Sequence, residues 1–486
     1  MKIKLDGKEI EVESGKSLLD ICRENGINVP TLCYHASLVP EARCRVCLVE
    51  MDGKLVTSCS TKPREGASIV TGNEHVMKAR RLNMELMLPN PSCRKEDDLE
   101  VCGIYEEVGM RTARFSSIKE YRPDLGAAVI RDNNKCINCG RCVRVCADIQ
   151  GVYAIDFASR AHNEHVTPYF EKNLADVACI RCGQCILNCP VGAISERSHI
   201  DEVVAALADK DKHVVAQVAP SIRAALGELF GMPAGTLVTG KTVAALRRCG
   251  FAKVFDVDLG ADITIMEEAS ELLRRVETGG PLPMITTCCP GWILMMEFFY
   301  HGLIENMSTC RSPHEMLGTL IKTYYAKKAG IDPKKIVVVS IMPCTAKKFE
   351  STRAELETGV DYVLTTRELG RLVKMKKVDF ASLPDEEFDP ALGISTGAGV
   401  IFGATGGVME AALRTAHFLA TGKELEKIEV NEIRGMKGIK EGKITLNGKE
   451  IRFACAHGGA NARKLIEQKD KYDFIEIMAC PGGCIG

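Results

Sequence analysis

The stretch CINCGRCVRVC, Cys136 to Cys146, holds four cysteines separated by two, two and three residues. The stretch CIRCGQCILNC, Cys179 to Cys189, repeats this spacing 43 residues later. Four thiolates at this spacing do not wrap one cubane comfortably, so three ligate one 4Fe–4S cluster and the fourth reaches the other. The predicted ligand sets are Cys136, Cys139, Cys142 and Cys189 for one cluster, and Cys179, Cys182, Cys185 and Cys146 for the other. The repeat therefore predicts a domain with two cubanes side by side, over about 121–208, that carries electrons.

The chain has 486 residues, 23 of them cysteine, and a net charge of −1. This charge gives no global attraction to nucleic acid or to an anionic membrane. The longest apolar runs are interrupted by polar residues well before the roughly 20 residues of a membrane span. The N-terminus, MKIKLDGKEIEV, shows no secretory signal pattern, so we expect a cytoplasmic protein. Thiols are kept reduced there, and metal ligation explains the cysteines better than disulfides do.

The first 73 residues form a small β-rich module. Asp6-Gly7 and Asp52-Gly53 predict two hairpins, and Ser17 is placed to cap a helix over Leu18–Asn25. Four further cysteines lie in this module with ten, two and eleven residues between them: Cys33, Cys44, Cys47 and Cys59. Soft thiolates in such a fold suit either a 2Fe–2S cluster or zinc, and spacing alone leaves both open.

Residues 74–120 are mainly helical and charged, and we interpret them as a connecting segment. From 209 to the end of the chain, helical patterns alternate with β-branched runs such as KIVVVSIM and ITLNGKEIRF. This alternation predicts a large α/β domain over 209–486, so the fold class is multidomain α+β. The turn GATGG resembles part of a dinucleotide fingerprint, but it lacks the acidic residue about twenty positions on, and we interpret it as a turn.

Three cysteine-containing stretches stand out in the last domain: TTCCPGW (286–292), MPCTAKKFE (342–350) and MACPGGCIG (478–486). The first contains the chain's only adjacent cysteine pair, Cys288-Cys289. From the residues alone, this pair forms a strained disulfide, shares a metal, or divides two tasks between two thiols.

These stretches, in this order, resemble the three signature motifs of the iron-only, diiron hydrogenases. IMEEASELL, STGAGVIFGATGGVMEAALRTA and AHGGANARKL are similar to the same family. The N-terminal module resembles the 2Fe–2S modules of complex I large subunits and of many iron hydrogenases, which implies a β-grasp fold. The repeat resembles bacterial two-cluster ferredoxins. The resemblance implies an enzyme that interconverts protons plus electrons with dihydrogen.

In that family the H-cluster is a 4Fe–4S cubane bridged by one thiolate to a diiron unit with carbonyl, cyanide and a dithiolate amine. By motif, the cubane ligands are Cys289, Cys344, Cys480 and Cys484, and Cys484 is the bridge. Cys288 is then the proton donor, and Lys347 hydrogen-bonds a cyanide. The resemblance also implies that Ala219, Pro220 and Ser221 cradle the other cyanide. Met342 and Met478 are then expected to pack the apolar pocket.

The family's proton route continues over carboxylates that match Glu268 and Glu271, with Ser308 alongside. Periodicity favours a different view of Glu271. In a helix expected to start near Ile263, the apolar stripe is Ile265, Met266, Ala269, Leu272 and Leu273. Glu268 flanks this stripe and Glu271 lies nearly opposite, so the pattern alone predicts a solvated Glu271.

The sequence departs from the family in two places. Many relatives carry a further cubane on one histidine and three cysteines, but the stretch LMLPNPSCRKEDDLEVCG offers only Cys93 and Cys102, with Asn90 near the histidine position. We therefore expect no cluster there. Family members also continue past the Cys484 motif, so we expect this chain to lack the usual C-terminal tail. Core packing is expected for Cys22, Cys249, Cys310 and Cys455.

The expected cofactors are one 2Fe–2S cluster, two 4Fe–4S clusters and the H-cluster. The expected partners are ferredoxin or flavin- and NAD(P)-binding subunits, the H-cluster maturation proteins, and a separate small chain that supplies the tail. We expect no nucleic acid and no membrane span. Two alternatives are a non-catalytic hydrogenase-like redox sensor or iron–sulfur assembly protein, and an electron-transfer subunit of the complex I type.

Overall fold

The computed structural model describes residues 1–87, 99–110, 114–115, 120–357, 359–390, 395–425, 428, 430–433, 436–446 and 448–485. The chain divides into two compact units. The first comprises Met1–Asp148, Tyr153–Val177 and Gln184–Ser195, and the second comprises Ile149–Val152, Ala178–Gly183 and Glu196–Gly486. Among the described residues, no helix is long and apolar enough to cross a membrane. The fold is mixed α/β.

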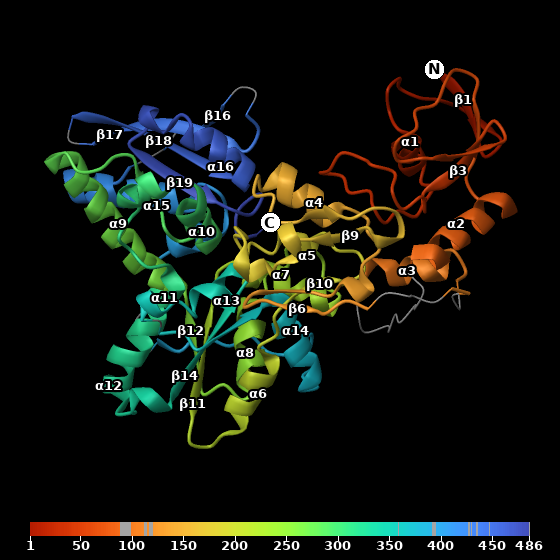
Figure 1. Ribbon diagram of the computed structural model, residues 1–486. Coiled ribbons are helices and arrows are strands. Elements are labelled where there is room, and N and C mark those ends of the chain that lie inside the picture. Colours follow the sequence, from red (N-terminus) through yellow and green to blue (C-terminus); the bar gives the residue numbers. More distant parts are fainter. Residues whose placement is uncertain are drawn as a thin grey trace. The chain divides into compact units, whose positions relative to one another are not determined.

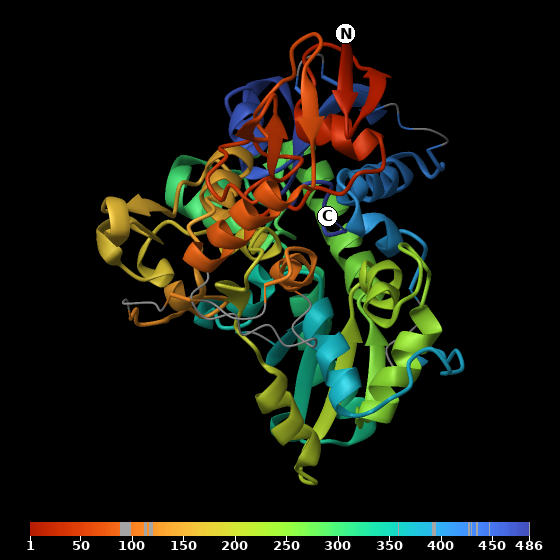
Figure 2. The same ribbon diagram turned by 90° about the vertical axis from the view of Figure 1, so that its right-hand side faces the viewer.

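The first unit begins with a five-stranded sheet, drawn in red and orange near the N-terminus in Figure 2. The order of its strands is β2-β1-β5-β3-β4. Its strands are β1 Lys2–Leu5, β2 Lys8–Glu11, β3 Leu48–Met51, β4 Lys54–Thr57 and β5 Ser68–Val70. The pair β1–β5 is parallel and the other pairs are antiparallel. Both predicted hairpins are confirmed. Asp6 and Gly7 have φ values of 46° and 85°, the left-handed geometry that a tight hairpin turn requires at both positions.

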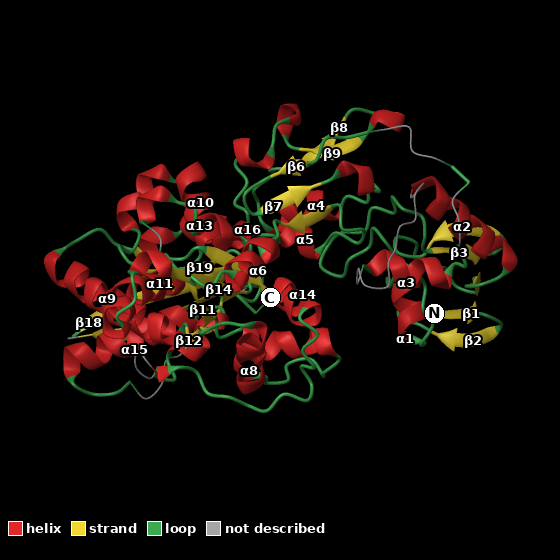
Figure 3. Cartoon of the chain, turned by 90° about the horizontal axis from the view of Figure 1, so that it is seen from below, coloured by secondary structure: helices red, strands yellow, loops and turns green. Residues whose placement is uncertain are grey.

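Helix α1 (Leu18–Glu24) packs against this sheet, and the Ser17 hydroxyl accepts a hydrogen bond from the Asp20 N–H, as predicted. Cys22 is fully buried in this core, which confirms its packing role. The connecting segment contributes α2 (Glu74–Met87) and α3 (Glu100–Glu107), both visible in Figure 3. Asn90 and Cys93 lie outside the described residues.

The rest of the first unit is built from short elements. Its strands are β6 Asp124–Leu125, β7 Val129–Arg131, β8 Asp156–Ala158, β9 His165–Thr167 and β10 Ile194–Glu196, and its helices are α4 Arg141–Arg144 and α5 Gln184–Leu187. Each cysteine repeat has the same local form, because a left-handed glycine, Gly140 or Gly183, precedes the short helix in both.

The second unit contains a parallel sheet of order β12-β11-β14-β15. Its strands are β11 His213–Val218, β12 Lys253–Asp256, β14 Ile336–Met342 and β15 Tyr362–Thr365. Figure 1 shows α11 (Pro313–Leu320) and α12 (Ala326–Ala329) on one side of the sheet, and α6 (Ile200–Ala208) and α8 (Thr239–Cys249) on the other. Coverage on both faces explains why β14 is buried at every position.

A second sheet has the order β13-β19-β18-β17-β16. Its strands are β13 Met284–Ile285, β16 Asn431–Glu432, β17 Ile439–Leu446, β18 Lys449–His457 and β19 Phe474–Met478. The remaining helices of the unit are α7 Ile222–Ala225, α9 Asp258–Thr278, α10 Pro290–Phe299, α13 Ala346–Glu350, α14 Thr366–Met375, α15 Gly407–Thr421 and α16 Gly459–Ile466. Apolar residues of α9 and α15 form a core with β17, β18 and β19.

The N-terminus of α15 lies at the GATGG turn. The Glu476 carboxylate of β19 accepts hydrogen bonds from the Gly406 and Met409 N–H groups, at 2.6 and 2.7 Å. A carboxylate of the chain itself thus occupies the helix N-terminus, where a dinucleotide phosphate binds in a fingerprint motif. This contact agrees with the interpretation of GATGG as a turn.

Helix α9 corrects three predictions. It begins at Asp258, five residues before the expected start, and Met266 of the predicted apolar stripe is 50% exposed. Glu271, predicted to be solvated, is only 4% exposed. The cause is tertiary: α11 and α15 both pack against α9, so more than one face of this helix is buried. A single-stripe pattern describes a helix with one buried face, and α9 has no such single face.

The strands position the three cysteine motifs. The carboxyl end of β11 leads to Ala219, the end of β14 leads to Cys344, and the end of β19 leads to Cys480. Cys288 and Cys289 follow β13 and precede α10. Loops at the carboxyl ends of parallel strands are the usual location of ligand sites in α/β proteins.

Candidate functional site

A cavity of about 70 Å³ lies where these loops meet. Residues predicted to surround a diiron unit line it, although they are up to 265 positions apart in the chain. They are Ala219, Pro220, Ser221, Cys288, Met342, Cys344, Lys347, Met478 and Cys484. The structure therefore brings together the three motifs and the loop after β11.

Of the four thiols predicted to hold a cubane, Cys344 and Cys484 line this cavity, and Cys289 and Cys480 lie close to them. Burial, and then repulsion from Cys289, raises the pKa of the Cys344 thiol to about 11. Burial and the neighbouring thiols likewise raise the pKa of Cys480 well above its ordinary value. Four soft sulfur donors crowded in a dry site suit an iron–sulfur cluster, whose positive charge removes the cost of ionising them. The residues present fit the cubane.

Cys288 and Cys289 are both free thiols, so the structure contains no strained disulfide between them. Burial raises the pKa of the Cys288 thiol well above its ordinary value, and the Glu476 and Glu268 carboxyls add to this effect. Cys288 therefore keeps its proton in the free chain and faces the cavity with it.

The Lys347 ammonium lies in the cavity wall and is 8% exposed. Its Nζ donates to Glu350 Oε2 at 2.8 Å and to the Cys288 carbonyl oxygen at 3.1 Å. Burial lowers the pKa of Lys347, but the Glu350 carboxylate outweighs this and the net pKa is raised. Lys347 is thus a fixed cation beside the predicted cyanide position.

Behind Cys288 lie the two carboxylates of the predicted proton route. Glu268 is fully buried, and within the described part of the chain its side-chain oxygens have no hydrogen-bond partner in good geometry, although Ser308 and the Thr287 N–H lie close enough to lower its pKa somewhat. Burial raises its pKa to about 8, so the carboxyl is protonated at neutral pH. Such an unsatisfied carboxyl is costly in a core and is typical of a functional position.

Glu271 is held by many donors. Its Oε1 accepts from Arg275 Nη2 at 2.7 Å, and its Oε2 accepts from the Thr309 N–H at 3.0 Å and from Ser308 Oγ at 3.2 Å. Burial raises the pKa of Glu271, but these hydrogen bonds outweigh it and the net pKa is lowered. The predicted route thus contains a neutral carboxyl, Glu268, followed by an ionised one, Glu271.

Sequence reasoning missed four residues of this region: Arg275, Thr309, His314 and Glu350. Arg275 stands four positions after Glu271, a spacing that pairs opposite charges on one helix face, so the sequence did contain a signal for it. His314 lines the cavity, but it lies in α11 outside all three motifs and gave no signal.

In the first unit, the cysteines Cys33, Cys44, Cys47 and Cys59 are all buried. The Cys33 N–H lies 3.4 Å from Cys44 Sγ, and the thiols of Cys33 and Cys47 each share a hydrogen bond with Cys59. The four sulfurs thus form one group, as a four-thiolate metal site requires.

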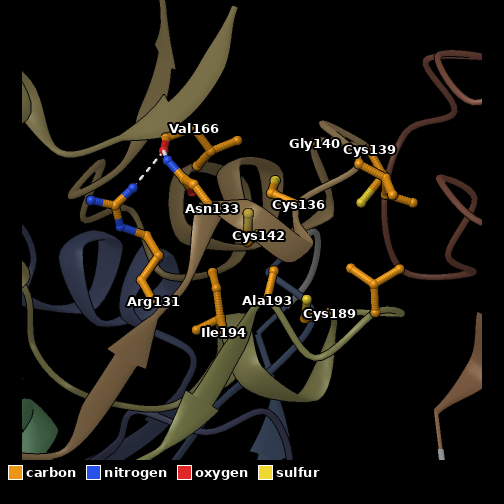
Figure 4. Close-up of a pocket in the computed structure, with 12 residues that line it drawn as sticks. Arg131, Asn133, Cys136, Cys139, Gly140, Cys142, Val166, Cys189, Ala193 and Ile194 are labelled. Atoms are coloured by element: carbon orange, nitrogen blue, oxygen red, sulfur yellow. Dashed lines mark hydrogen bonds between the residues drawn. The ribbon is translucent and has the colours of Figure 1, made fainter. Parts of the chain in front are cut away.

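The predicted ligands of the first cubane line one cavity of about 20 Å³. Figure 4 shows Cys136, Cys142 and Cys189 around it, with Cys139 at its edge. At its rim, Arg131 Nη1 and Asn133 Nδ2 both donate to the Val166 carbonyl oxygen, at 2.6 and 2.9 Å. The structure therefore brings the fourth cysteine of the second repeat to the first three of the first repeat. The other predicted set, Cys146, Cys179, Cys182 and Cys185, is half-buried.

The buried core around this cavity also contains Cys33 and Cys44 of the N-terminal module. Arg144, in α4, donates from Nη2 to the Cys33 carbonyl oxygen at 2.6 Å. Arg141 donates to the Tyr34 carbonyl oxygen and pairs with Glu100 at 2.6 Å. The 2Fe–2S ligand loop therefore contacts the helix that carries Cys142 directly.

In the second unit, the loop with Cys179 and Cys182 packs against the signature motifs. A Cβ on Gly291 would lie 3.2 Å from the Ala479 Cβ and 3.8 Å from the Cys182 Cβ, so glycine permits this close packing. Thr345 Oγ1 donates to the Arg181 carbonyl oxygen at 3.1 Å. Cys182 also lies near enough to Cys480 to raise its pKa.

Comparison with known proteins agrees with this geometry. Residues 212–486 match the model of the iron only hydrogenase large subunit, C-terminal domain. Residues 1–74 match a 2Fe-2S iron-sulfur cluster binding domain, and residues 135–195 match a 4Fe-4S dicluster domain.

Two curated relatives are similar over nearly their whole length. The NADP-reducing hydrogenase subunit HndD of Solidesulfovibrio fructosivorans is 45% identical, over 100% of this chain and 88% of its own. Iron hydrogenase 1 of Clostridium pasteurianum is 41% identical, over 99% of this chain and 87% of its own.

An apo FeFe hydrogenase from Chlamydomonas reinhardtii, solved as a single-residue variant, is similar in structure. It has a TM-score of 0.54 and 44% identity, over 60% of this chain and 84% of its own. From the matched domains, these relatives and the cavity with its surrounding thiols, we conclude that the chain belongs to the iron-only hydrogenase family.

Proposed function

We propose that the protein reversibly oxidises dihydrogen and reduces protons at an H-cluster, with electrons relayed through its iron–sulfur clusters. One observation carries this proposal: a protonated thiol, Cys288, and a fixed ammonium, Lys347, face one dry cavity beside the cubane cysteines. A cubane alone needs neither group. The proton donor and the cation are needed where protons and anionic ligands meet a metal.

The residues then have distinct tasks. Cys289, Cys344, Cys480 and Cys484 would hold the cubane, and Cys484 would link it to the diiron unit. When bound, this group would supply the open metal site where dihydrogen is split or formed. Lys347, together with Ala219, Pro220 and Ser221, would orient the cyanides, while Met342 and Met478 keep the pocket apolar and exclude water.

Protons move between Cys288 and the surface over Glu268, Ser308 and Glu271. The neutral Glu268 carboxyl donates or accepts at the buried end, and the ionised Glu271 lies next along the route. Arg275 holds Glu271 in place through two hydrogen bonds to Oε1, at 3.1 and 2.7 Å.

Electrons enter through the N-terminal clusters. The contact of Arg144 with the Cys33 loop supports direct transfer from the 2Fe–2S cluster to the first cubane, without a cluster in the connecting segment. By the cysteine spacing, the second cubane would be held by Cys146, Cys179, Cys182 and Cys185. The packing of Cys182 near Gly291 and Ala479 supports its role as the donor to the H-cluster.

The domain organisation supports this division of labour. We assign residues 1–73 to a β-grasp 2Fe–2S module, 74–120 to the connecting segment, 121–208 to a ferredoxin-like domain, and 209–486 to the catalytic domain. The mixed five-stranded sheet with α1 supports the first assignment.

The partners are redox proteins. The similarity to a subunit of an NADP-reducing hydrogenase supports flavin- and NAD(P)-binding subunits, and ferredoxin is the other partner we propose. Maturation proteins that build the diiron unit complete the set. We propose a cytoplasmic location, where buried cysteines such as Cys33 stay reduced.

A hydrogenase-like sensor or assembly protein keeps the cubane without the diiron unit. In such a protein the cavity beside the cubane has no occupant, and a fully buried Glu268 without a well-formed hydrogen bond would cost stability for no purpose. The geometry therefore favours the enzyme.

The test is dye reduction by dihydrogen. The chain is produced with and without the maturation proteins, and hydrogen-dependent reduction of a viologen dye is measured anaerobically. We expect turnover only in the matured protein. Matured protein with complete clusters and no hydrogen-dependent reduction would contradict the proposal.

A further inference from the structure

Three buried polar residues, His314, Glu315 and Glu350, lie beside the cavity, and the proposed function gives none of them a task; Glu350 ends the MPCTAKKFE stretch, whereas His314 and Glu315 lie outside the motifs. Their exposures are 1%, 0% and 2%, and they stand next to Lys347, itself 8% exposed. His314 and Lys347 line the cavity, whereas Glu350 lies behind them. Burying this many ionisable groups is costly unless they pair with one another through ion pairs and hydrogen bonds.

One carboxylate oxygen links the group. Glu350 Oε2 lies 2.7 Å from His314 Nε2 and 2.8 Å from Lys347 Nζ. The same Nζ lies 3.1 Å from the carbonyl oxygen of Cys288. An ammonium has three donors, so two are used by these contacts and one is left for the cavity.

The protonation states follow from the surroundings. Burial and the nearby Lys347 lower the pKa of His314 to about 4, so its ring is neutral. Burial raises the pKa of Glu350, but Lys347 and His314 outweigh it and lower the pKa to about 2. A neutral ring that donates from Nε2 to Glu350 must accept at Nδ1, and Ser340 Oγ lies 3.1 Å from Nδ1.

A metal ion is the competing occupant, because ligand atoms of His314, Glu315 and Glu350 all lie within 4.8 Å of one another. The Lys347 ammonium, however, already pairs with the shared Glu350 oxygen. A divalent cation on that oxygen would face the ammonium at close range in a dry site, where like charges repel strongly. The arrangement instead fits a set of hydrogen bonds through which Glu350 and His314 hold Lys347 in place, which we call the clamp.

We propose that Glu350 and His314 are positioning residues, which fix the Lys347 ammonium and the Cys288 backbone in the wall of the cavity where the diiron unit would bind. This inference rests on the proposed function. Glu350 holds the ammonium, and His314 holds Glu350, because its own ring is held by Ser340 on β14. The clamp thereby ties the proton-donor loop to a rigid strand.

The chain supplies a matched control one residue away. Lys348 and Glu368 form another lysine–glutamate pair, 2.8 Å apart with both side chains 0% exposed, and neither residue lines the cavity. Glu368→Gln therefore breaks an equally buried ion pair without touching the clamp. Any general effect of losing a buried charge should appear in this variant.

The experiment compares matured wild-type protein with Glu350→Gln, His314→Leu, His314→Gln and the Glu368→Gln control. Infrared spectroscopy follows the cyanide stretching bands, and dye reduction follows turnover. In Glu350→Gln and His314→Leu we expect shifted or broadened cyanide bands and a loss of turnover of about 10- to 100-fold, the usual effect of removing a supporting contact at a metal site. His314→Gln keeps an N–H donor and should recover part of both signals.

Unchanged cyanide bands in both Glu350→Gln and His314→Leu would overturn the clamp, and so would an equal shift in Glu368→Gln. If Glu350→Gln does not fold, His314→Leu decides the question, because it leaves the Lys347–Glu350 pair in place. Wild-type protein without carbonyl or cyanide bands would instead overturn the proposed function.

Discussion

Replacing Glu268 with Gln tests the proton route at its buried end. The structure places this carboxyl in a fully buried position with a pKa of about 8, against an ordinary value of 4.5. At pH 7 roughly nine in ten molecules then carry the proton, compared with about one in three hundred for a carboxyl of ordinary pKa. Ionising Glu268 in the folded chain therefore costs on the order of 5 kcal/mol more than ionising a carboxyl of ordinary pKa.

The assay is an infrared pH titration of the protonated carboxyl band, combined with initial rates of hydrogen production. In wild-type protein we expect the band to disappear near pH 8 and the rate to fall over the same range, because only the protonated group donates. Glu268→Gln should lack the band and lose about 100-fold or more in turnover.

The same pKa has a consequence for stability. Between pH 4.5 and about 8, the folded chain binds a proton that the unfolded chain releases, so the free energy of unfolding falls as the pH rises. Glu268→Gln should remove this fall. A band that titrates near pH 4.5, or a Gln variant with wild-type turnover at neutral pH, would refute the reasoning.

Three further changes test other parts of the site. Arg275→Gln leaves a buried Glu271 without its cation, so chemical denaturation should show a loss of about 3 to 5 kcal/mol; a loss below 1 kcal/mol would contradict the pairing. Cys288→Ser should keep the iron content and lose turnover, whereas Cys289→Ser should lose cubane iron; identical behaviour of the two variants would end the proposed division of tasks. Arg144→Gln removes a positive charge beside the 2Fe–2S loop, so a redox titration followed by electron paramagnetic resonance should give a lower midpoint potential, and an unchanged potential would count against the contact.

The sequence predicted best those features of the fold and the site that depend on spacing over a few residues. Cysteine intervals predicted the group formed by Cys136, Cys139, Cys142 and Cys189, and the Asp-Gly pairs predicted both hairpins of the N-terminal sheet. Turn chemistry and ligand spacing act over a few residues, so they can be read without the fold.

The periodicity of apolar residues gave wrong predictions where tertiary packing buries more than one face of a helix. Glu271 looked solvated because periodicity assumes one buried helix face, whereas α9 is covered by both α11 and α15. The clamp around Lys347 could not be predicted from the sequence for a related reason. His314, Ser340 and Glu350 lie on three different elements, and only the fold brings them within hydrogen-bond distance.

The central claim is that this chain holds a diiron unit beside its cubane. Infrared spectroscopy of the matured protein tests it most directly, because bound carbonyl and cyanide absorb where protein does not. The account predicts both sets of bands in wild-type protein and their loss in Cys484→Ala, which lacks the bridging thiolate. Matured protein that contains its iron–sulfur clusters but shows neither set of bands would contradict the account.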